Sequence, residues 1–229
     1  MNPTKIEWCD FTWNPLTGCL HGCVYCYARK QAKRFYDFGF KPMFHPGRLY
    51  DPAMRKKPAR IFVVSMGDLF GDWVPDGWIE LVFEACEAAP QHTYYFLTKN
   101  PERYGYDSDD IIQLKSNYWF GVSVDNQDQY MDIASIWPFR SRSPNQFISL
   151  EPIQSEFVIS GHFIPHWLIV GAETGNRKGK VIPKREWLLD IRKKCHKLGI
   201  PLFEKDSLAQ LDLPGGLIQQ WPDKKASEK

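Results

Sequence analysis

The stretch that decides the fold is Cys19-Leu20-His21-Gly22-Cys23-Val24-Tyr25-Cys26-Tyr27, near the start of a chain of 229 residues. It holds three of the six cysteines of the chain, separated by three and then by two residues. Cysteine thiolates are the usual protein ligands of iron–sulfur clusters, and this spacing lets three thiolates reach one cluster. A four-iron cluster held by three thiolates keeps one iron open, and an open metal position is typical of chemistry rather than of scaffolding.

A structural zinc site is the alternative for the same three cysteines. Its fourth ligand would be Cys9, His21 or His45. Zinc sites usually contain two pairs of ligands at short separation, and the sequence has no second Cys-x2-Cys pair. The one His-x3-His pair, His162 and His166, lies far along the chain. The pattern therefore favours an iron–sulfur cluster over zinc.

The cysteine spacing, with Tyr25 just before the last cysteine, resembles the signature of radical S-adenosylmethionine (SAM) enzymes. The resemblance implies that Cys19, Cys23 and Cys26 hold a [4Fe-4S] cluster, that the fourth iron binds SAM, and that electron transfer cleaves SAM to a 5′-deoxyadenosyl radical. It also implies a reductant protein such as flavodoxin or ferredoxin as a partner. Within this superfamily, residues 18–28 are similar to the same region of the spore photoproduct lyase family.

Further motifs resemble a phage-associated radical-SAM-like family over most of the chain. They are KIEW at 5–8, TWNP at 12–15, SMGDLF at 65–70, LTK at 97–99 and VGAE at 170–173. Members of that family often carry a longer insert between the first two cysteines than this chain does.

Composition predicts one ordinary globular domain. Hydrophobic residues make up 43% of the chain and charged residues 24%, and the length suits a single core. We expect this domain to span residues 1–222 and residues 223–229 to form a disordered tail. No stretch approaches the roughly 18 apolar residues of a membrane span, and the start of the chain lacks the apolar core of a signal peptide. We therefore expect a cytoplasmic protein, in which cysteines stay reduced.

Short apolar runs alternate with segments of helical periodicity, which predicts right-handed βαβ units and a parallel sheet. A first strand is expected within residues 1–18, and residues 40–59, with four prolines, read as a surface loop. Helices are expected at 27–38, 75–89, 127–137 and 184–198, the last ended by Gly199, and a weaker helix is expected from Pro101, interrupted at Gly105 and resuming at 109–115. The helix at 75–89 would bury one face made of Trp78, Leu81, Val82, Ala85 and Cys86. Further strands are expected at 60–65, 93–99, 118–125, 146–152, 167–171 and 201–205. The radical SAM resemblance implies that this α/β fold is a partial (β/α)6 barrel.

Charged side chains follow the apolar runs, where the carboxyl ends of parallel strands would meet at one edge. They are Asp68, Lys99, Asp125, Glu151, Glu173 and Lys205. Each of them read alone could instead be a strand-end cap or an ion-pair partner, but all six together favour an active site.

The resemblance assigns roles to several of these positions. Ser65, Gly67 and Asp68 stand where radical SAM enzymes contact the amino group of SAM, and Ser123 and Asp125 where they hold its ribose hydroxyls. Glu151 and Glu173 would contact SAM or substrate, and Tyr25 is expected to help bind the cofactor. Lys99 and Lys205 could bind an anionic group of the substrate or the carboxylate of SAM.

The net charge of +2 conceals two basic segments. Residues 29–60 contain ten Lys or Arg against two acids, and residues 177–197 contain nine against two. These segments could bind a phosphate backbone, or they could be solvated helix surface. The leading hypothesis is a radical SAM enzyme that acts on nucleic acid or a nucleotide. The alternatives are a zinc- or cluster-stabilised nucleic-acid-binding module without turnover, and a radical SAM enzyme that acts on a peptide or small metabolite.

Overall fold

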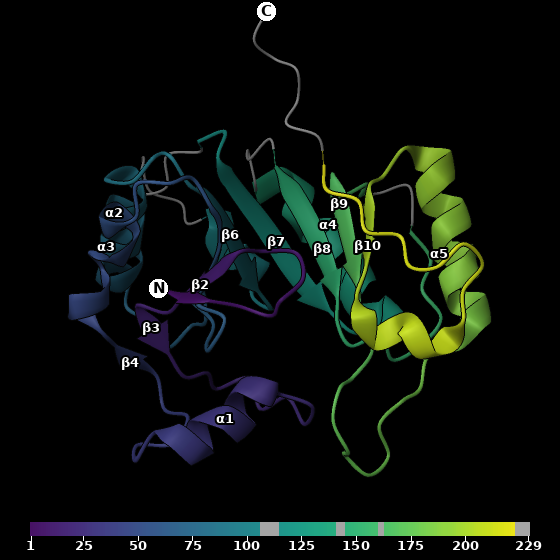
Figure 1. The fold of residues 1–229 in the computed structure, drawn as a ribbon, viewed down its shortest axis with the longest axis horizontal. Coiled ribbons are helices and arrows are strands. Elements are labelled where there is room, and N and C mark those ends of the chain that lie inside the picture. Colours follow the sequence, from purple (N-terminus) through teal and green to yellow (C-terminus); the bar gives the residue numbers. More distant parts are fainter. Residues whose placement is uncertain (106–114, 141–144, 160–162, 223–229) are drawn as a thin grey trace, which may run out of the picture. The chain divides into compact units, whose positions relative to one another are not determined.

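The computed structural model describes residues 1–105, 115–140, 145–159 and 163–222 (Figure 1). The chain divides into two compact units, Met1–Val122 with Arg140–Asn145, and Ser123–Phe139 with Gln146–Lys229. Each unit is described by itself. The single domain over residues 1–222 stays a prediction, and the expected tail at 223–229 lies outside the described residues, as does nearly all of the helix expected at 109–115.

The first unit is built on strands that lie in the order β1 (Asn2–Pro3), β2 (Phe11–Trp13), β5 (Arg60–Val63), β6 (Thr93–Thr98) and β7 (Tyr118–Val124). β1 is antiparallel to β2, and the other pairs are parallel. The β-branched and aromatic runs predicted from the sequence form β5, β6 and β7, since such side chains fill both faces of a covered sheet. The carboxyl ends of β2, β5 and β6 therefore lie along one edge.

The core of the first unit is aromatic. Phe83 of α3 (Asp76–Glu87) stacks on Phe96 of β6 with ring centroids 4.8 Å apart, and Phe96 stacks on Phe120 of β7 at 5.3 Å. The buried face of α3 consists of Ile79, Val82, Phe83 and Cys86. The expected face, with Trp78, Leu81, Val82, Ala85 and Cys86, is wrong in part, because Leu81 is 40% exposed. The three consecutive apolar residues Leu81, Val82 and Phe83 allow two helix faces, and the larger ring of Phe83 takes the core position.

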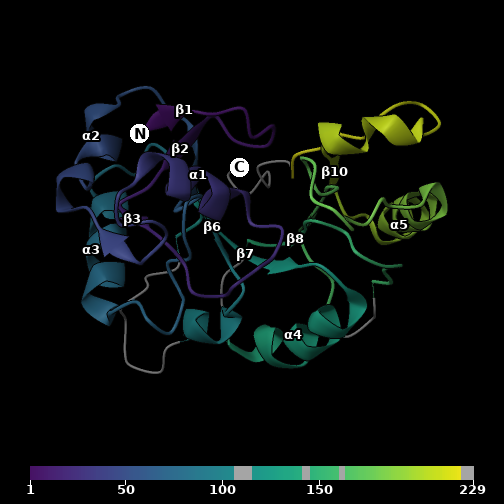
Figure 2. The ribbon, with the colours of Figure 1, turned by 90° about the horizontal axis from the view of Figure 1, so that it is seen from below.

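The proline-rich segment 40–59 contains short regular elements, which corrects its interpretation as a loop. β4 (Met43–Phe44) pairs antiparallel with β3 (Leu16–Thr17). A 3-10 turn at Pro46–Arg48 and the helix α2 (Asp51–Met54) follow. Both begin with a proline in the first turn, where its missing N–H costs nothing and its fixed φ favours a helical start. Figure 2 shows α2 beside α3.

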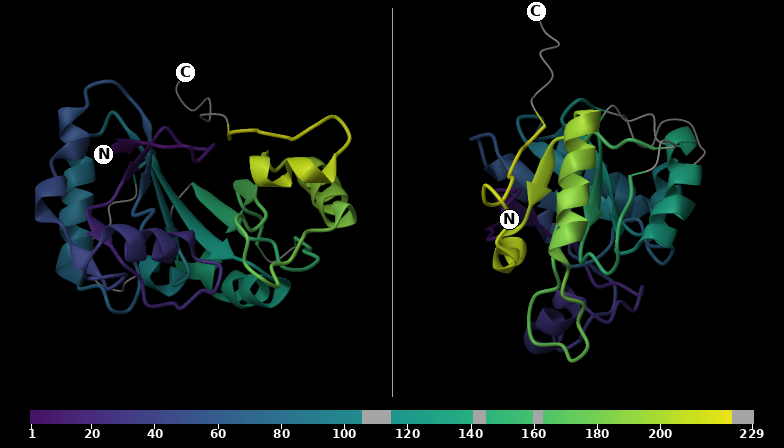
Figure 3. Two further views of the ribbon diagram at one scale, coloured as in Figure 1. Left: turned by 60° about the horizontal axis from the view of Figure 1, so that its bottom comes forward. Right: turned by 90° about the vertical axis from the view of Figure 1, so that its right-hand side faces the viewer.

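The second unit contains the parallel strands β8 (Gln146–Leu150), β9 (Trp167–Val170) and β10 (Leu202–Glu204), which are buried throughout. Helix α5 (Arg185–Leu198) runs alongside β10 (Figure 3) and is fixed there by Arg192, whose guanidinium donates to both carboxylate oxygens of Glu204 at 2.7 and 2.6 Å. Gly199 ends α5 with a left-handed φ of 67°, as the sequence predicted.

Helix α4 (Gln127–Arg140) is longer than expected. The prediction ended it before Pro138, but the helix continues through this proline to Arg140. Proline removes only one backbone hydrogen bond, and here it lies in the last turn, where little helix remains to be disrupted.

The fold-class prediction is confirmed: the protein is mixed α/β, and its strands are mostly parallel. None of the helices in the described part of the chain is long and apolar enough to cross a membrane.

Candidate metal and cofactor site

The three cysteines of the motif lie on one loop of the first unit, between β3 and α1 (Tyr27–Phe35). All three are half-buried free thiols. Cys26 is the N-cap of α1, and its Sγ accepts a hydrogen bond from the Arg29 N–H at 3.3 Å. The Cys26 N–H in turn donates to the Cys23 carbonyl at 3.3 Å. The Cys26 sulfur is thus positioned at a helix N-terminus, where backbone N–H groups and the helix dipole favour negative charge.

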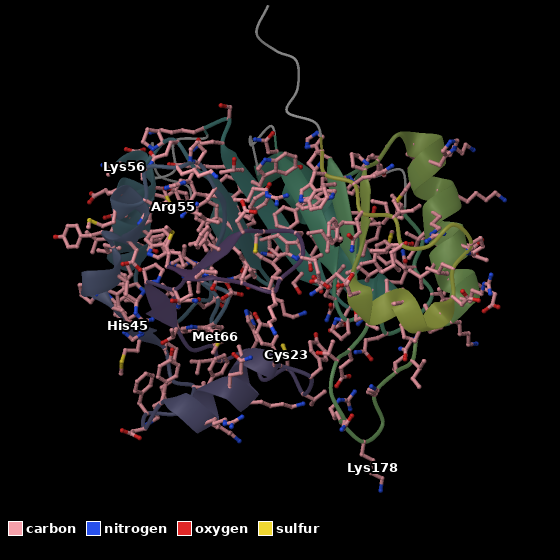
Figure 4. All side chains as sticks on the ribbon, viewed as in Figure 1. Cys23, His45, Arg55, Lys56, Met66 and Lys178 are labelled. Carbon is pink, nitrogen blue, oxygen red and sulfur yellow. The ribbon has the colours of Figure 1, made fainter. Side chains whose placement is uncertain are left out.

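The loop is fixed against the segment that follows β5. The Gly18 N–H donates to the Met66 carbonyl at 2.8 Å, and Gly18 and Gly67 form a parallel bridge. A Cβ on Gly18 would lie 2.2 Å from the Lys41 carbonyl oxygen, and a Cβ on Gly67 would lie 2.7 Å from the Gly18 oxygen. Only glycine allows this close backbone approach. Figure 4 labels Cys23 and Met66, which lie on the two joined segments.

Burial dominates the electrostatics of the first cysteine. Burial is the main cause that raises the pKa of the Cys19 thiol to about 12; a backbone hydrogen bond at His21 opposes it, and the Asp68 carboxylate and the other two cysteines add to it. Without a metal, Cys19 is therefore a neutral thiol at neutral pH. Metal binding has to displace its proton, and the positive charge of the metal ions offsets the repulsion among three thiolates.

The three cysteines do not form a closed site for a single metal ion. Nowhere in the described ranges do three His, Cys, Asp or Glu side chains converge closely enough to hold one metal ion. A cubane presents a different iron to each thiolate, so its ligands need not converge on one point.

The fourth zinc ligands considered from the sequence are all engaged elsewhere. The Cys9 thiol is buried and directed at the Ile6 carbonyl, 3.8 Å away, and His45 Nε2 lies 2.8 Å from Thr17 Oγ1. His21 Nε2 lies 2.8 Å from a carboxylate oxygen of Asp68.

Asp68 connects three segments of the first unit. Its buried carboxylate accepts hydrogen bonds from Thr98 Oγ1 at 2.7 Å and from the Lys99 N–H at 3.1 Å, both at the end of β6. It also accepts from the Phe70 N–H at 3.0 Å and pairs with His21 of the cysteine loop. The role expected for Asp68, a contact to the SAM amino group, stays a prediction; the structure shows that both carboxylate oxygens already hold protein groups.

Other predicted residues of the first unit lie around the same loop. The ammonium of Lys99 is 5.8 Å from the ring centroid of Tyr25. The Ser65 hydroxyl is 3.3 Å from the Asn14 side chain, and its carbonyl accepts a hydrogen bond from the Tyr27 hydroxyl at 2.7 Å. The structure thus gathers the predicted residues of the first unit at the carboxyl ends of β5 and β6.

The predicted residues of the second unit are largely held in pairs. Lys205 Nζ lies 2.8 Å from Glu151 Oε1, and Ser149 Oγ donates to the other carboxylate oxygen of Glu151 at 2.9 Å. Glu173 is buried and accepts two hydrogen bonds of 2.7 Å from Arg177.

Ser123 and Asp125 belong to the end of β7 and the residues after it. Asp125 is buried and accepts a hydrogen bond from the Asn126 side chain at 2.7 Å. Ser123 is half-buried, one residue before the end of the strand.

The model of the family described as "Protein of unknown function (DUF5131)" matches residues 3–210. The chain belongs to this family. No curated protein sequence matches the chain.

Among solved structures, two mutants of spore photoproduct lyase are similar to this DUF5131 member. A tyrosine-to-phenylalanine mutant matches with 11% identity and a TM-score of 0.54, and a cysteine-to-serine mutant with 12% identity and the same TM-score. Each comparison covers 89% of this chain and 78% of the other. At this identity the likeness shows the fold alone: the chain shares its fold with spore photoproduct lyase.

Several site residues of this DUF5131 member were not predicted from the sequence as members of the site. His21 was considered only as a zinc ligand, although it pairs with Asp68, and its ring also contacts Trp73 edge-on with centroids 4.8 Å apart. Arg177 was counted only as part of a basic segment. Its spacing of four residues from Glu173 is the one signal that could have indicated the pair.

Proposed function

We propose that the chain is a radical SAM enzyme that holds a [4Fe-4S] cluster through Cys19, Cys23 and Cys26 and acts on a nucleic acid or a nucleotide. The observation that carries the proposal is the loop of three free cysteines, fixed beside the carboxyl ends of β2 and β5, in a fold shared with spore photoproduct lyase. When bound, the cluster would supply an electron to SAM and so a radical that abstracts hydrogen.

Residues of the first unit would bind and orient the cofactor. Gly18 and Gly67 hold the cysteine loop against the segment after β5. Lys99, beside the ring of Tyr25, would hold the SAM carboxylate or an anionic group of the substrate. Ser65, Gly67 and Asp68 are proposed to contact the SAM amino group. For Asp68 this contact would add to its bonds with Thr98 and Lys99 or replace the one with His21.

For the second unit, Ser123 and Asp125 are proposed to hold the ribose hydroxyls of SAM. Glu151, Glu173 and Lys205 are proposed as contacts of SAM or substrate. Glu151 and Lys205 form an ion pair, so a ligand that binds either of them has to share or open that pair. This constraint favours a ligand group that is itself charged.

The surface of α1 supports a substrate with a phosphate backbone. Ala28 and Ala32 are buried, and Lys30, Lys33 and Arg34 are exposed on the rest of the helix surface. This basic surface begins directly after Cys26, the last cysteine of the motif. Phosphate groups are attracted to such a surface, and their binding weakens as salt rises.

A reductant protein such as flavodoxin or ferredoxin is proposed as the electron donor. Leu20 and Val24 of the cysteine loop are 57% and 71% exposed, which gives a partner an apolar contact next to the thiols. We place the enzyme in the cytoplasm, because the cysteines have to stay reduced to bind iron. The association with phages is proposed only from the resemblance of the sequence motifs.

The proposal is tested on anaerobically purified, reconstituted protein. About four irons per chain, and 5′-deoxyadenosine after reduction with SAM, would support it. Separate replacement of Cys19, Cys23 and Cys26 by alanine should remove iron and SAM cleavage while the protein stays folded. Cys195→Ala is the matched control, since Cys195 is a buried thiol of α5 in the second unit.

Other results would favour the alternatives. Stoichiometric zinc without SAM cleavage would overturn the proposal in favour of a binding module. Loss of the whole fold in every cysteine variant would indicate a structural metal. SAM cleavage that no oligonucleotide or nucleotide affects would point to a peptide or small-metabolite substrate.

A further inference from the structure

A groove of about 540 Å³ lies on the first unit, away from the cysteine loop. Its walls come from Phe11 at the start of β2, from Asp51 and Met54 of α2, and from the segment Arg55-Lys56-Lys57, with Met1 at one side. This basic segment directly precedes β5, whereas the cysteine loop is bound to the segment that follows β5. Figure 4 shows Arg55 and Lys56 on one side of the unit and Cys23 and Met66 on the other.

The groove carries a net positive charge. Arg55, Lys56 and Lys57 contribute three cations, while the lining carboxylate of Asp51 is paired with the amino group of Met1. The nearby Asp10 is neutralised by Arg60, which donates to its carboxylate at 2.8 Å. An anion that enters the groove therefore meets cations whose charge is not balanced by carboxylates of the same wall.

The Arg55 side chain has a buried donor that could bind a ligand. Its guanidinium lies over the ring of Phe11, 4.2 Å from the centroid. Its Nε is buried and has no hydrogen-bond partner within the described ranges. A charged donor that is buried without an acceptor is costly, and such groups in native proteins usually bind something that the protein itself does not supply.

Flat and apolar surfaces lie next to these cations. Tyr50, the residue before α2, is 73% exposed, and Met54 at the end of α2 is 80% exposed. Aromatic rings next to Lys and Arg are the usual platform for the bases of single-stranded nucleic acid, which stack on the rings while the phosphates contact the cations.

We propose that this groove binds a segment of single-stranded nucleic acid. Phosphates would contact Lys56 and Lys57 and accept from Arg55, and a base would stack near Tyr50. The inference rests on the nucleic-acid half of the proposed function and deepens it, because the groove would hold part of the substrate strand away from the site of reaction.

The length of β5 gives an approximate distance between the groove and the segment that holds the cysteine loop. The four residues of β5 separate the two ends, and at about 3.3 Å per residue they span about 13 Å. A dinucleotide is too short to fill both places, whereas a strand of about 12 nucleotides can. The groove should therefore increase the affinity of the protein for longer strands. Its removal should leave the affinity for a dinucleotide unchanged.

The test is fluorescence anisotropy of full-length reconstituted protein with a labelled oligonucleotide of about 12 nucleotides, over a range of salt concentrations. Lys56→Gln with Lys57→Gln should weaken binding roughly tenfold and make the salt dependence shallower by about 1.4, since each phosphate contact on a single strand contributes about 0.7 to the slope. Arg55→Lys keeps the charge but not the planar group, so it should weaken binding without changing the slope.

The matched control is Lys193→Gln with Lys197→Gln, which removes the same charge from the exposed surface of α5 in the second unit, the basic segment that the proposed groove does not use. It should leave affinity and slope unchanged. The inference is overturned if the groove variant binds like the wild type, or if inorganic polyphosphate displaces the oligonucleotide equally well per phosphate. Cleavage of SAM in the absence of oligonucleotide tests the proposed function separately. If the wild type does not cleave SAM, the proposed function is wrong. If a groove variant cleaves SAM and binds the oligonucleotide with unchanged affinity, only the inference about the groove is wrong.

Discussion

At the scale of the residue, Asp68 decides how the cysteine loop is held. Its carboxylate accepts from a side-chain hydroxyl and from two backbone N–H groups, and it pairs with His21. Replacing this carboxylate with a group that cannot accept from all of these donors leaves buried donors without a matching acceptor.

We expect Asp68→Asn to lower the free energy of unfolding of the metal-free protein by about 2 kcal/mol or more. The new amide group would face backbone N–H donors instead of accepting from them. Urea unfolding measures the loss. Asp72→Asn is the control, because Asp72 is exposed and accepts a hydrogen bond from the Asn100 side chain at the surface, so its loss should stay below about 0.5 kcal/mol. Equal losses in the two variants would contradict a structural role for Asp68.

The pair of Asp10 and Arg60 gives a pH-dependent contribution to stability. The hydrogen bonds from Arg60 lower the pKa of Asp10 below its ordinary value of 3.8. A carboxyl with a lowered folded-state pKa stabilises the protein above its unfolded-state pKa, and this contribution disappears as the pH falls through the folded-state value.

We expect Asp10→Asn to reduce stability at pH 7 by at most about 1 kcal/mol, because the pair is partly exposed to solvent. The difference from the wild type should shrink below about pH 4. Unfolding by urea at several pH values measures it. A difference that stays constant down to pH 2.5 would mean that the Asp10 charge contributes nothing.

At the scale of the element, the cysteine loop depends on a glycine at the position of closest approach. Gly18 has a φ of 93°, and a Cβ there would overlap the Lys41 carbonyl. Gly22, inside the same loop, has a φ of 76°, but nothing lies within 4 Å of its Cβ position. Both positions have a positive φ that strains any residue with a side chain, but only at Gly18 would a Cβ also meet another backbone segment.

We therefore expect Gly22→Ala to cost about 1 kcal/mol from strain alone, and Gly18→Ala to cost clearly more, because a backbone segment must also move. The reconstituted Gly18 variant should also hold less iron than the Gly22 variant. Urea unfolding and iron content measure the two effects. Equal behaviour of the two variants would show that the contact with Lys41 yields easily.

The sequence predicts those helices and strands whose hydrophobic pattern lies within one continuous segment. Strands β5, β6, β8 and β9 follow from apolar runs, and α5 from its period and from Gly199. The buried face of α3 was predicted wrongly in part, because Phe83 is selected by rings of β6 and β7 far away in the sequence. The short elements of residues 40–59 depend likewise on the pairing of β3 with β4.

At the scale of the whole molecule, sequence located the charged strand ends but not their partners. Glu151 and Lys205 each read as a site residue, and the structure shows that they bind one another. Their pairing joins residues 54 positions apart, so no local pattern carries it. The cysteine motif could be recognised because all three cysteines lie within eight residues.

The division into two units predicts where the proposed cluster would stabilise the protein. All three cysteines belong to the first unit. A ligand that binds only the folded state stabilises the structure that contains its site. Hydrogen exchange should therefore show that cluster loading slows exchange in β2, β5 and β6 more than in α5. Equal slowing in α5 would show that the two units open as one.

The six thiols differ in burial, so their reaction with an alkylating reagent can show whether the cysteine loop holds a ligand. Cys9, Cys86 and Cys195 are buried, and burial raises the pKa of the latter two, so an alkylating reagent should reach them only after unfolding. In the folded, metal-free chain the reagent should modify Cys23 and Cys26 first and Cys19 slowly. Mass spectrometry of peptides alkylated before unfolding would then report, molecule by molecule, whether the loop was empty or filled.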